Sequence, residues 1–333
     1  MATGQHKMPT LRTIAQLSGL AVPTVSRALN DAPDIGQKTK ERVRQIARDI
    51  GYVPNRAGVR LRTGKTNVVS LVLGTDNDVA DHMGQLVSSV AGTLRSTRYH
   101  VVVTPYFPDE DPMIPVRFIV ETGAADALIL NRIEVDDPRV EYLMEKNIPF
   151  VTYGRSKWRD SHPYFDFDNE VFGRLGAETL VGAGRKFLTL LAPPQELNYS
   201  QDMIRGATKM LEAHGIKLNI LPDITADDPG PDIQDKVAEY LTSCPDCDGM
   251  ICPSTIAAMA ATVGAERIGR RLGQDFDIFA REATPLMGYF RAPIGSVLED
   301  MMMAGSFLAN AAVQAIEKPE LPPMQKLVSA TPQ

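Results

Sequence analysis

The spacing of apolar positions along the 333 residues changes near residue 67. After that point, short apolar runs typical of buried parallel strands alternate with stretches of helical periodicity. The apolar runs are NVVSLVLG, HVVVTPY, ADALILN, PFVTYG, FLTLLA, DGMICP and DFDIFA. The helical stretches are 84–97, 137–146, 168–183, 200–214, 232–243, 255–271 and 300–317. This alternation predicts an α/β fold with two lobes, each a parallel sheet flanked by helices.

Before residue 67 the pattern is helical, and the stretch from Leu11 to Asn30 predicts two short helices joined by a tight turn. A small residue, Ala15, suits a steep helix crossing, and Gly19 suits the turn because glycine tolerates a left-handed backbone. Val25 would close the small core. The polar residues left on the second helix are Thr24, Ser26, Arg27 and Asn30. Both a helix-turn-helix and a helical hairpin that merely caps a domain fit this pattern.

Residues 37–50 predict a third helix, and its two sides differ sharply. The apolar side carries Val43, Ile46, Ala47 and Ile50, and the other side carries Lys38, Lys40, Arg42 and Arg44. Pro54 would break this helix, and Asn55 could cap a short helix running to about Leu61. That short helix is too polar to be stable alone, so we expect it to form only against a partner surface.

The charge of the chain is unevenly divided. Residues 1–65 carry 12 Lys or Arg and 4 Asp or Glu, a net charge of +8, whereas the remaining residues carry 23 and 37, a net charge of −14. A basic head on an acidic body indicates a polyanionic partner at one end of the chain. This distribution favours the helix-turn-helix interpretation of the first helices.

Other functional classes find little support in the sequence. The chain lacks an apolar run approaching the ~18 residues of a membrane span, and MATGQHKMPT lacks the apolar core of a secretory signal. We therefore expect a cytoplasmic protein without a membrane partner. The CPDC motif at 244–247 has no second pair of Cys or His nearby to complete four ligands, so we expect no metal site and no cofactor. The five His residues form no recognisable catalytic motif, and an enzyme is not expected.

Four motifs carry a family resemblance: TIAQLSGL with PTVSRALN, GYVPN, RLRTGKTN, and RLGAETLVGAGRKFLTLLAP. On these motifs the chain resembles the LacI/GalR family of bacterial transcription regulators over essentially its full length. The resemblance implies a helix-turn-helix DNA-binding domain at 1–52 and a hinge helix or linker at 53–66. It also implies a periplasmic-binding-protein-like effector-binding and dimerisation domain at 67–333. The expected lobe boundaries are about 67–166 with 298–320 for the first lobe, and about 167–295 with 321–333 for the second.

The resemblance further implies a homodimer that binds palindromic double-stranded operator DNA, with Leu61 of each hinge helix inserted into the minor groove. Val22, Pro23 and Arg27 would face base edges, and Arg27 is best suited to bidentate contact with guanine. The other positions assigned to DNA contact are Thr10, Leu11, Thr24, Ser26, Asn30, Thr39, Tyr52, Asn55 and Ala57. Ala21 replaces the capping Ser usual in the family, at a cost of ~1 kcal/mol to the second helix.

A small-molecule effector is expected between the two lobes. The positions that the resemblance assigns to it are Asp76, Asn131, Arg155, Asp168, Met203, Arg205, Ser254, Glu282 and Glu299. Met203 stands where relatives carry an Arg, so a polar group is missing there and Arg205 is the alternative cation. The block HPYFDFDNE suits sugar hydroxyls and ring stacking, and it suits equally a crossover turn in which Asp168 caps a helix.

Together these features predict a repressor of a sugar-utilisation operon whose operator affinity is controlled by a sugar-like effector. The similarity of HPYFDFDNE to α-glucoside regulators points to a glucoside or another oligosaccharide. Two alternatives stay open at this point. One is a co-repressor-dependent regulator or an activator with a non-sugar effector. The other is a sugar-binding transport protein, against which the basic head and the missing signal argue.

Overall fold

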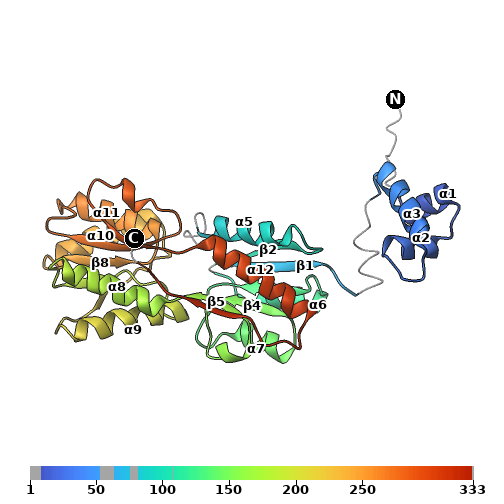
Figure 1. Ribbon diagram of the computed structural model, residues 1–333. Helices are drawn as coiled ribbons and strands as arrows, with labels where there is room; N and C mark the ends of the chain where they lie inside the picture. Colours follow the sequence, from blue (N-terminus) through green and yellow to red (C-terminus); the bar gives the residue numbers. More distant parts are fainter. Residues whose placement is uncertain (1–8, 53–63, 76–81, 108, 332–333) are drawn as a thin grey trace. The chain divides into compact units, whose positions relative to one another are not determined.

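The computed structural model describes residues 9–52, 64–75, 82–107 and 109–331, and the chain divides into two compact units, 1–66 and 67–333 (Figure 1). Each unit has its own apolar core. Among the described residues, none of the helices combines the length and the apolar character needed to cross a membrane. Four of the predicted site residues lie outside the described ranges: Asn55, Ala57, Leu61 and Asp76.

The first unit is a three-helix head, as predicted. Its helices are α1 (Leu11–Ser18), α2 (Val22–Leu29) and α3 (Gln37–Asp49). Ile14, Val25 and Val43, one from each helix, are completely buried in its core. Gly19 ends α1 with a left-handed backbone (φ 70°). The turn into α2 therefore needs the conformation that glycine adopts without strain, as predicted from the sequence.

The first turns of α1 and α2 are stabilised differently. Thr10 caps α1 through a reciprocal pair of hydrogen bonds with Thr13, one from each residue's backbone N–H to the other's hydroxyl. Ala21 precedes α2, and its methyl group cannot accept a hydrogen bond from the exposed backbone amides. Pro23 lies in the first turn of α2, where its missing N–H costs nothing. Helix α2 therefore lacks a side-chain cap at its N-terminus, as the sequence predicted from Ala21.

The first lobe of the second unit is a six-stranded parallel sheet with the order β11-β5-β4-β3-β1-β2. Helices α5 and α12 cover one face and α6 and α7 cover the other (Figure 1). The strands are β1 (Val68–Gly74), β2 (His100–Tyr106), β3 (Ala127–Leu130), β4 (Phe150–Tyr153), β5 (Tyr164–Phe167) and β11 (Gln325–Val328). The helices are α5 (His82–Leu94), α6 (Met113–Thr122), α7 (Pro138–Glu145), α12 (Met301–Glu317) and the short 3-10 turn η2 (Arg159–Ser161).

The second lobe repeats this design with a five-stranded parallel sheet in the order β10-β9-β8-β6-β7. Helices α8 and α9 pack on one face, and α10 and α11 pack on the other. The strands are β6 (Leu188–Leu190), β7 (Asn219–Ile220), β8 (Gly249–Cys252), β9 (Asp277–Glu282) and β10 (Gly295–Leu298). The helices are α8 (Asn169–Gly182), α9 (Asn198–Glu212), α10 (Gly230–Ser243), α11 (Thr255–Arg267) and the 3-10 turn η3 (Met287–Tyr289).

The chain passes between the lobes three times, and the last passage corrects the predicted lobe boundary. The passages follow β5, β10 and β11. The sequence predicts that 321–333 belong to the second lobe, but β11 pairs with β5 in the first sheet, and the segment after it, with Ala330, packs in the second-lobe core. The prediction was wrong because β11 is a short edge strand whose QKLV sequence lacks a strong apolar run.

Helices α8 and α9 approach each other unusually closely, and two glycines allow it. A Cβ atom on Gly173 of α8 would overlap the backbone carbonyl of Met203 on α9. A Cβ atom on Gly206 of α9 would overlap the carbonyl of Glu170 on α8. The two backbones are thus in direct contact, and this contact fixes the first turns of both helices next to the site described below.

We therefore predict that Gly206→Ala lowers the free energy of unfolding by about 1–3 kcal/mol, because the added methyl group must push two backbones apart. The measurement is urea denaturation of the full chain. The matched control is Gly182→Ala in α8, where a Cβ atom meets nothing within 4 Å, and where we expect a change within about 1 kcal/mol, towards higher stability. Equal stabilities of the two variants would contradict this account of the packing.

Candidate functional sites

The exposed side of α2 carries the residues that the sequence assigned to base contact. Val22, Pro23 and Arg27 are all exposed, whereas Thr24 and Ser26 are partly buried. Arg27 forms an ion pair with Asp34 in the segment between α2 and α3. A base or phosphate that engages Arg27 must therefore compete with this carboxylate. Base contact by these residues stays a prediction.

The cationic side of α3 is smaller than the sequence suggested. Lys40 is buried, and its ammonium group donates to the backbone oxygen of Asp31 at 3.2 Å and pairs with the Asp31 carboxylate at 3.0 Å. Arg44 pairs with the same carboxylate at 2.9 Å. These contacts lower the pKa of Asp31, chiefly through the Lys40 hydrogen bond. Lys40 and Arg44 hold α3 against the end of α2, and Lys38 and Arg42 are the exposed cations of the four.

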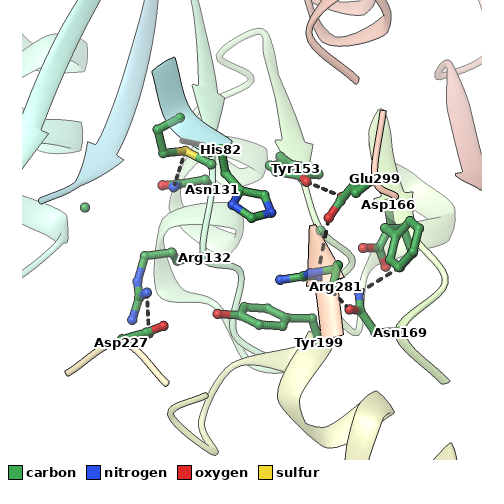
Figure 2. A pocket seen from close by; sticks show the side chains of 14 residues that line it. His82, Asn131, Arg132, Tyr153, Asp166, Asn169, Tyr199, Asp227, Arg281 and Glu299 are labelled. Carbon is green, nitrogen blue, oxygen red and sulfur yellow. Dashed lines mark hydrogen bonds and ion pairs between the residues drawn. The ribbon is translucent and has the colours of Figure 1, made fainter. Parts of the chain in front are cut away.

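A cavity opens in the second unit where strands of both sheets end (Figure 2). The cavity has a volume of about 90 Å³. The carboxyl ends of parallel strands are the usual ligand site in such sheets. The first lobe contributes Gly74, His82, Met83, Asn131, Arg132, Tyr153, Gly154, Asp166 and Phe167, and the remaining lining residues are Asn169, Tyr199, Asp227, Arg281 and Glu299.

Arg281 and Glu299 form the polar centre of this cavity. Glu299 is almost fully buried just after β10, and it accepts a hydrogen bond from the Tyr153 hydroxyl of β4. Its other carboxylate oxygen lies 3.4 Å from Nη1 of Arg281. Burial raises the pKa of Tyr153 well above its usual value, so the phenol keeps its proton and remains a donor. Residues from both lobes thus converge on one carboxylate.

Arg281 is held from several sides, and its orientation is therefore well defined. Its Nε donates to the Pro253 carbonyl oxygen at 2.8 Å, and its Nη1 donates to Oδ1 of Asn169 at 3.0 Å. The guanidinium lies 5.9 Å from the ring centres of Phe167 and Tyr199, within the range of a cation–π contact. Figure 2 shows the Tyr199 ring and the Arg281 side chain facing the same space. This arrangement supplies an aromatic surface and hydrogen-bonding groups side by side.

Asn131, at the end of β3, leaves hydrogen-bonding capacity for a ligand. Its amide nitrogen donates to the thioether sulfur of Met83 at 3.5 Å, a weak acceptor. Its amide oxygen has no hydrogen-bond partner within the described part of the chain. A buried amide in this state costs free energy unless something else satisfies it. A hydroxyl group, which both donates and accepts, would do so.

Ion pairs join the two lobes beside the cavity. Arg132 of the first lobe pairs with Asp227 of the second at 2.6 Å. Arg155 pairs with Asp166 of β5 at 2.6 Å and with Asp202 of α9 at 2.8 Å. Arg155, predicted as an effector contact, is therefore a link between the lobes.

Several other predicted effector positions have structural roles, and these assignments are corrected. Met203 is completely buried in the second-lobe core. Arg205 pairs on the surface with Glu170 and Asp202. Asp168 and Ser254 accept hydrogen bonds at the N-termini of α8 and α11, so the N-cap interpretation of Asp168 is correct. Glu282 binds the backbone amides of Leu286 and Met287 and the hydroxyl of Ser296. Of the eight predicted positions that the structure describes, Asn131 and Glu299 line the cavity.

The cavity residues that the sequence did not identify include Arg281 and Tyr199. Side chains alternate along a strand, so Arg281 and Glu282 of β9 point in opposite directions, and the residue facing the cavity is Arg281. The guanidinium missing at Met203 of helix α9 is thus supplied by Arg281 of strand β9. The HPYFDFDNE block predicted part of the site, because Asp166, Phe167 and Asn169 line the cavity. No group of His, Cys, Asp or Glu among the described residues could hold a metal ion.

Comparison with known proteins agrees with this architecture. Residues 10–55 match the family model "Bacterial regulatory proteins, lacI family", and residues 119–319 match a periplasmic binding protein domain. The "HTH-type transcriptional regulator AglR" of Rhizobium meliloti (strain 1021) is 30% identical over 318 residues, which cover 92% of this chain and 87% of that protein.

Two solved structures share the fold over 98% of both chains. The lac repressor dimer bound to operator and the anti-inducer ONPF matches with a TM-score of 0.84 at 19% identity. The transcriptional regulator CelR in complex with cellobiose matches with a TM-score of 0.70 at 23% identity. The fold is that of a helix-turn-helix head joined to a two-lobed periplasmic-binding-protein-like body. The chain belongs to the LacI family of bacterial transcription regulators.

The cavity carboxylate Asp166 leads to a pH prediction. Burial raises its pKa to about 7 in the folded protein, even though Arg155 opposes the shift, while the ordinary value is 3.8. The folded protein therefore binds a proton more tightly than the unfolded chain. The contribution of Asp166 to the free energy of unfolding is largest below about pH 4 and is lost as the pH rises through about 7.

We predict that Asp166→Asn reduces the fall in unfolding free energy between pH 5 and pH 8, measured by urea denaturation at several pH values. Asp160→Asn, at an exposed position in η2, is the control and should keep the wild-type slope. An unchanged slope in Asp166→Asn would show that the carboxyl group is ionised throughout this range.

Proposed function

We propose that this protein is a dimeric repressor that binds palindromic operator DNA through its helix-turn-helix heads and is controlled by a sugar-like effector in the cavity between its lobes. The observation that carries the effector assignment is the cavity itself, which combines Tyr199 with donors and acceptors from Arg281, Asn131 and Glu299. Sugars present apolar ring faces and many hydroxyl groups, and this lining complements both. Such a regulator would act in the cytoplasm, where its operator lies.

The names of similar proteins support a sugar rather than another metabolite. The CelR structure contains cellobiose, and a ribose operon repressor of Bacillus subtilis (strain 168) is 24% identical over 315 residues. The cations that line the cavity are already paired with carboxylates, Arg132 with Asp227 and Arg281 with Glu299, so an anionic effector would have to compete with these pairs. The proposed effector is therefore a neutral, hydroxyl-rich molecule.

An exposed apolar surface on the first lobe supports the dimer. Val102 and Val103 lie on β2, the edge strand of the first sheet, and are 44% and 43% exposed. Ile114 and Phe118, one helical turn apart on the neighbouring α6, are 59% and 61% exposed. An edge strand with adjacent apolar side chains is a typical protein interface, and a second copy of this chain is the partner that we propose for it.

The DNA-binding part of the proposal predicts that Arg27→Ala removes sequence discrimination. We expect affinity for operator DNA, recovered by selection from random duplexes, to fall by roughly 10- to 100-fold, while weak, salt-sensitive binding to any DNA remains. The measurement is fluorescence anisotropy at two salt concentrations. The matched control, Arg48→Ala at the exposed end of α3, should retain discrimination. Unchanged operator affinity in Arg27→Ala would contradict the assignment.

The effector part predicts that Asn131→Ala weakens sugar binding by about 10-fold, because one or two hydrogen bonds to the ligand are lost. A thermal-shift screen of neutral sugars and phosphorylated metabolites first finds a stabilising ligand, and calorimetry then gives its affinity for each variant. Asn310→Ala, exposed on α12, is the control and should bind normally. Both variants should bind operator DNA as the wild type does.

Adding the ligand to the operator complex reveals the sign of the regulation. Release of the DNA would establish an inducer, and tighter binding would establish a co-repressor. Stabilisation by nucleobases alone would overturn the sugar assignment.

A further inference from the structure

The CPDC motif at 244–247, which the proposed function leaves unused, forms a tight turn between α10 and β8 in the second lobe. The backbone N–H of Cys247 donates to the carbonyl oxygen of Cys244 at 3.0 Å, so the four residues close a β-turn. Pro245 stands at the second position of this turn, where its fixed backbone angle is favourable. A β-turn keeps its first and last Cα atoms within about 7 Å, and disulfides join cysteines whose Cα atoms are about 4.4–6.8 Å apart. The backbone therefore brings the two cysteines to about the separation that a disulfide requires.

The two thiols lie beside the same pair of hydroxyl groups. The Thr189 hydroxyl of β6 lies 3.4 Å from Sγ of Cys247 and 3.0 Å from the Tyr240 hydroxyl of α10. Burial raises the pKa of Tyr240, and the adjacent thiols of Cys247 and Cys244 raise it further, the latter also through a hydrogen bond. Both sulfur atoms are therefore close to the Tyr240 hydroxyl, on one side of the turn.

The two cysteines differ in their access to solvent. Cys247 is completely buried in the apolar core of the second lobe, and this burial raises the pKa of its thiol. Cys244 is partly exposed at the C-terminal end of α10. A small solute therefore meets Cys244 first, and Cys247 lies behind it as a protonated thiol. A reactive, accessible cysteine with a second cysteine poised beside it is the usual arrangement of a redox-active pair.

Arg270, in the segment after α11, holds the turn in this shape. Its Nη2 donates to the backbone oxygens of Pro245 and Cys247, the latter at 3.0 Å, so one guanidinium binds two carbonyl groups of the motif. Its positive charge also acts on the Cys247 thiol, whose pKa it lowers, although less than burial raises it. A cation beside a thiol favours the thiolate, which is the form that attacks an oxidant or a second sulfur. Arg270 is therefore a positioning residue for this pair.

The third cysteine of the chain has none of these features. Cys252 is completely buried at the end of β8, where its backbone pairs with Ala280 of β9. Burial raises the pKa of its thiol strongly. Cys252 is thus inaccessible, and it serves as an internal reference for the reactivity of the other two.

We propose that Cys244 and Cys247 are a reversible redox pair, which a hydroperoxide converts to an intramolecular disulfide. First, the Cys244 sulfur attacks one peroxide oxygen and the O–O bond breaks. The products are a sulfenic acid at Cys244 and, with the thiol proton, one molecule of water or alcohol. Then the Cys247 sulfur attacks the sulfenic sulfur, the S–S bond forms, and the hydroxyl group leaves as water with the proton of Cys247. The two thiols lose two electrons to the peroxide, and a dithiol reductant returns them.

The test treats the reduced full-length protein with hydrogen peroxide under native conditions and then blocks the remaining thiols with a maleimide in denaturant. An endoproteinase that cleaves before Asp246 and Asp248 separates the three cysteines, so that two of these peptides stay joined only through a disulfide. Mass spectrometry should find the Cys244 and Cys247 peptides joined and Cys252 blocked by the maleimide. Dithiothreitol should restore all three thiols.

Four substitutions sharpen the test. In Cys247→Ala no disulfide should form, and a sulfenic acid should accumulate at Cys244, where dimedone captures it. Cys252→Ala is its matched control and should form the disulfide as the wild type does. Arg270→Ala should slow disulfide formation by at least about 5-fold, because the turn loses its support and its cation. Arg271→Ala, at the exposed neighbouring position, should keep the wild-type rate.

Peptide mapping of the unsubstituted chain tests the pairing even if Cys247→Ala fails to fold. A disulfide that includes Cys252 or joins two chains would overturn the pairing. Oxidation of Cys244 to a sulfinic acid without a disulfide, or three unreacted thiols at peroxide concentrations that oxidise free cysteine, would overturn the redox pair. Equal rates in Arg270→Ala and Arg271→Ala would overturn the role of Arg270.

Discussion

The carboxylate of Glu299 connects the two lobes of the second unit at the cavity, and the arrangement of the cavity residues depends on this connection. It lies in a segment that crosses from the second lobe to the first, and it binds Tyr153 on one side and Arg281 on the other. A buried charge is tolerated only when it is paired and hydrogen-bonded, and removal of one partner leaves the other uncompensated. The lobes are therefore joined at this point by an interaction that also forms the centre of the cavity.

Much of the fold could be predicted because its elements repeat strongly. Each of the seven apolar runs contains an observed strand, and alternation with helices was enough to predict two parallel sheets. The α-helix and strands that were not predicted are α6, β5, β7, β10 and β11. Helix α6, with Pro115 in its first turn, has apolar residues on most sides, and strand β11 begins with Gln and Lys. Their structure depends on packing against neighbours that are distant in sequence.

The site was harder to predict than the fold, for a geometric reason. Asn131 follows a strong strand, so its place at the end of the sheet could be inferred. Whether Arg281 or Glu282 faces the cavity depends on the orientation of strand β9, because adjacent side chains on a strand point to opposite faces. Tyr199 lies at the cavity because of where helix α9 packs, and the sequence of α9 alone does not predict that position. Family similarity did not predict the Arg281 guanidinium, because it pointed to position 203 on helix α9, whereas Arg281 lies on strand β9.

The close approach of α8 and α9 at Gly173 and Gly206 also bears on how this protein can evolve. The two glycines fix helices α8 and α9 backbone to backbone, while Asn169 and Tyr199, in the first turns of the same helices, face the cavity. The glycines that support the scaffold are thus separate from Tyr199, which faces the cavity. Substitution at 199 can alter the cavity on a scaffold that stays rigid, so new specificities are accessible without passing through unstable intermediates.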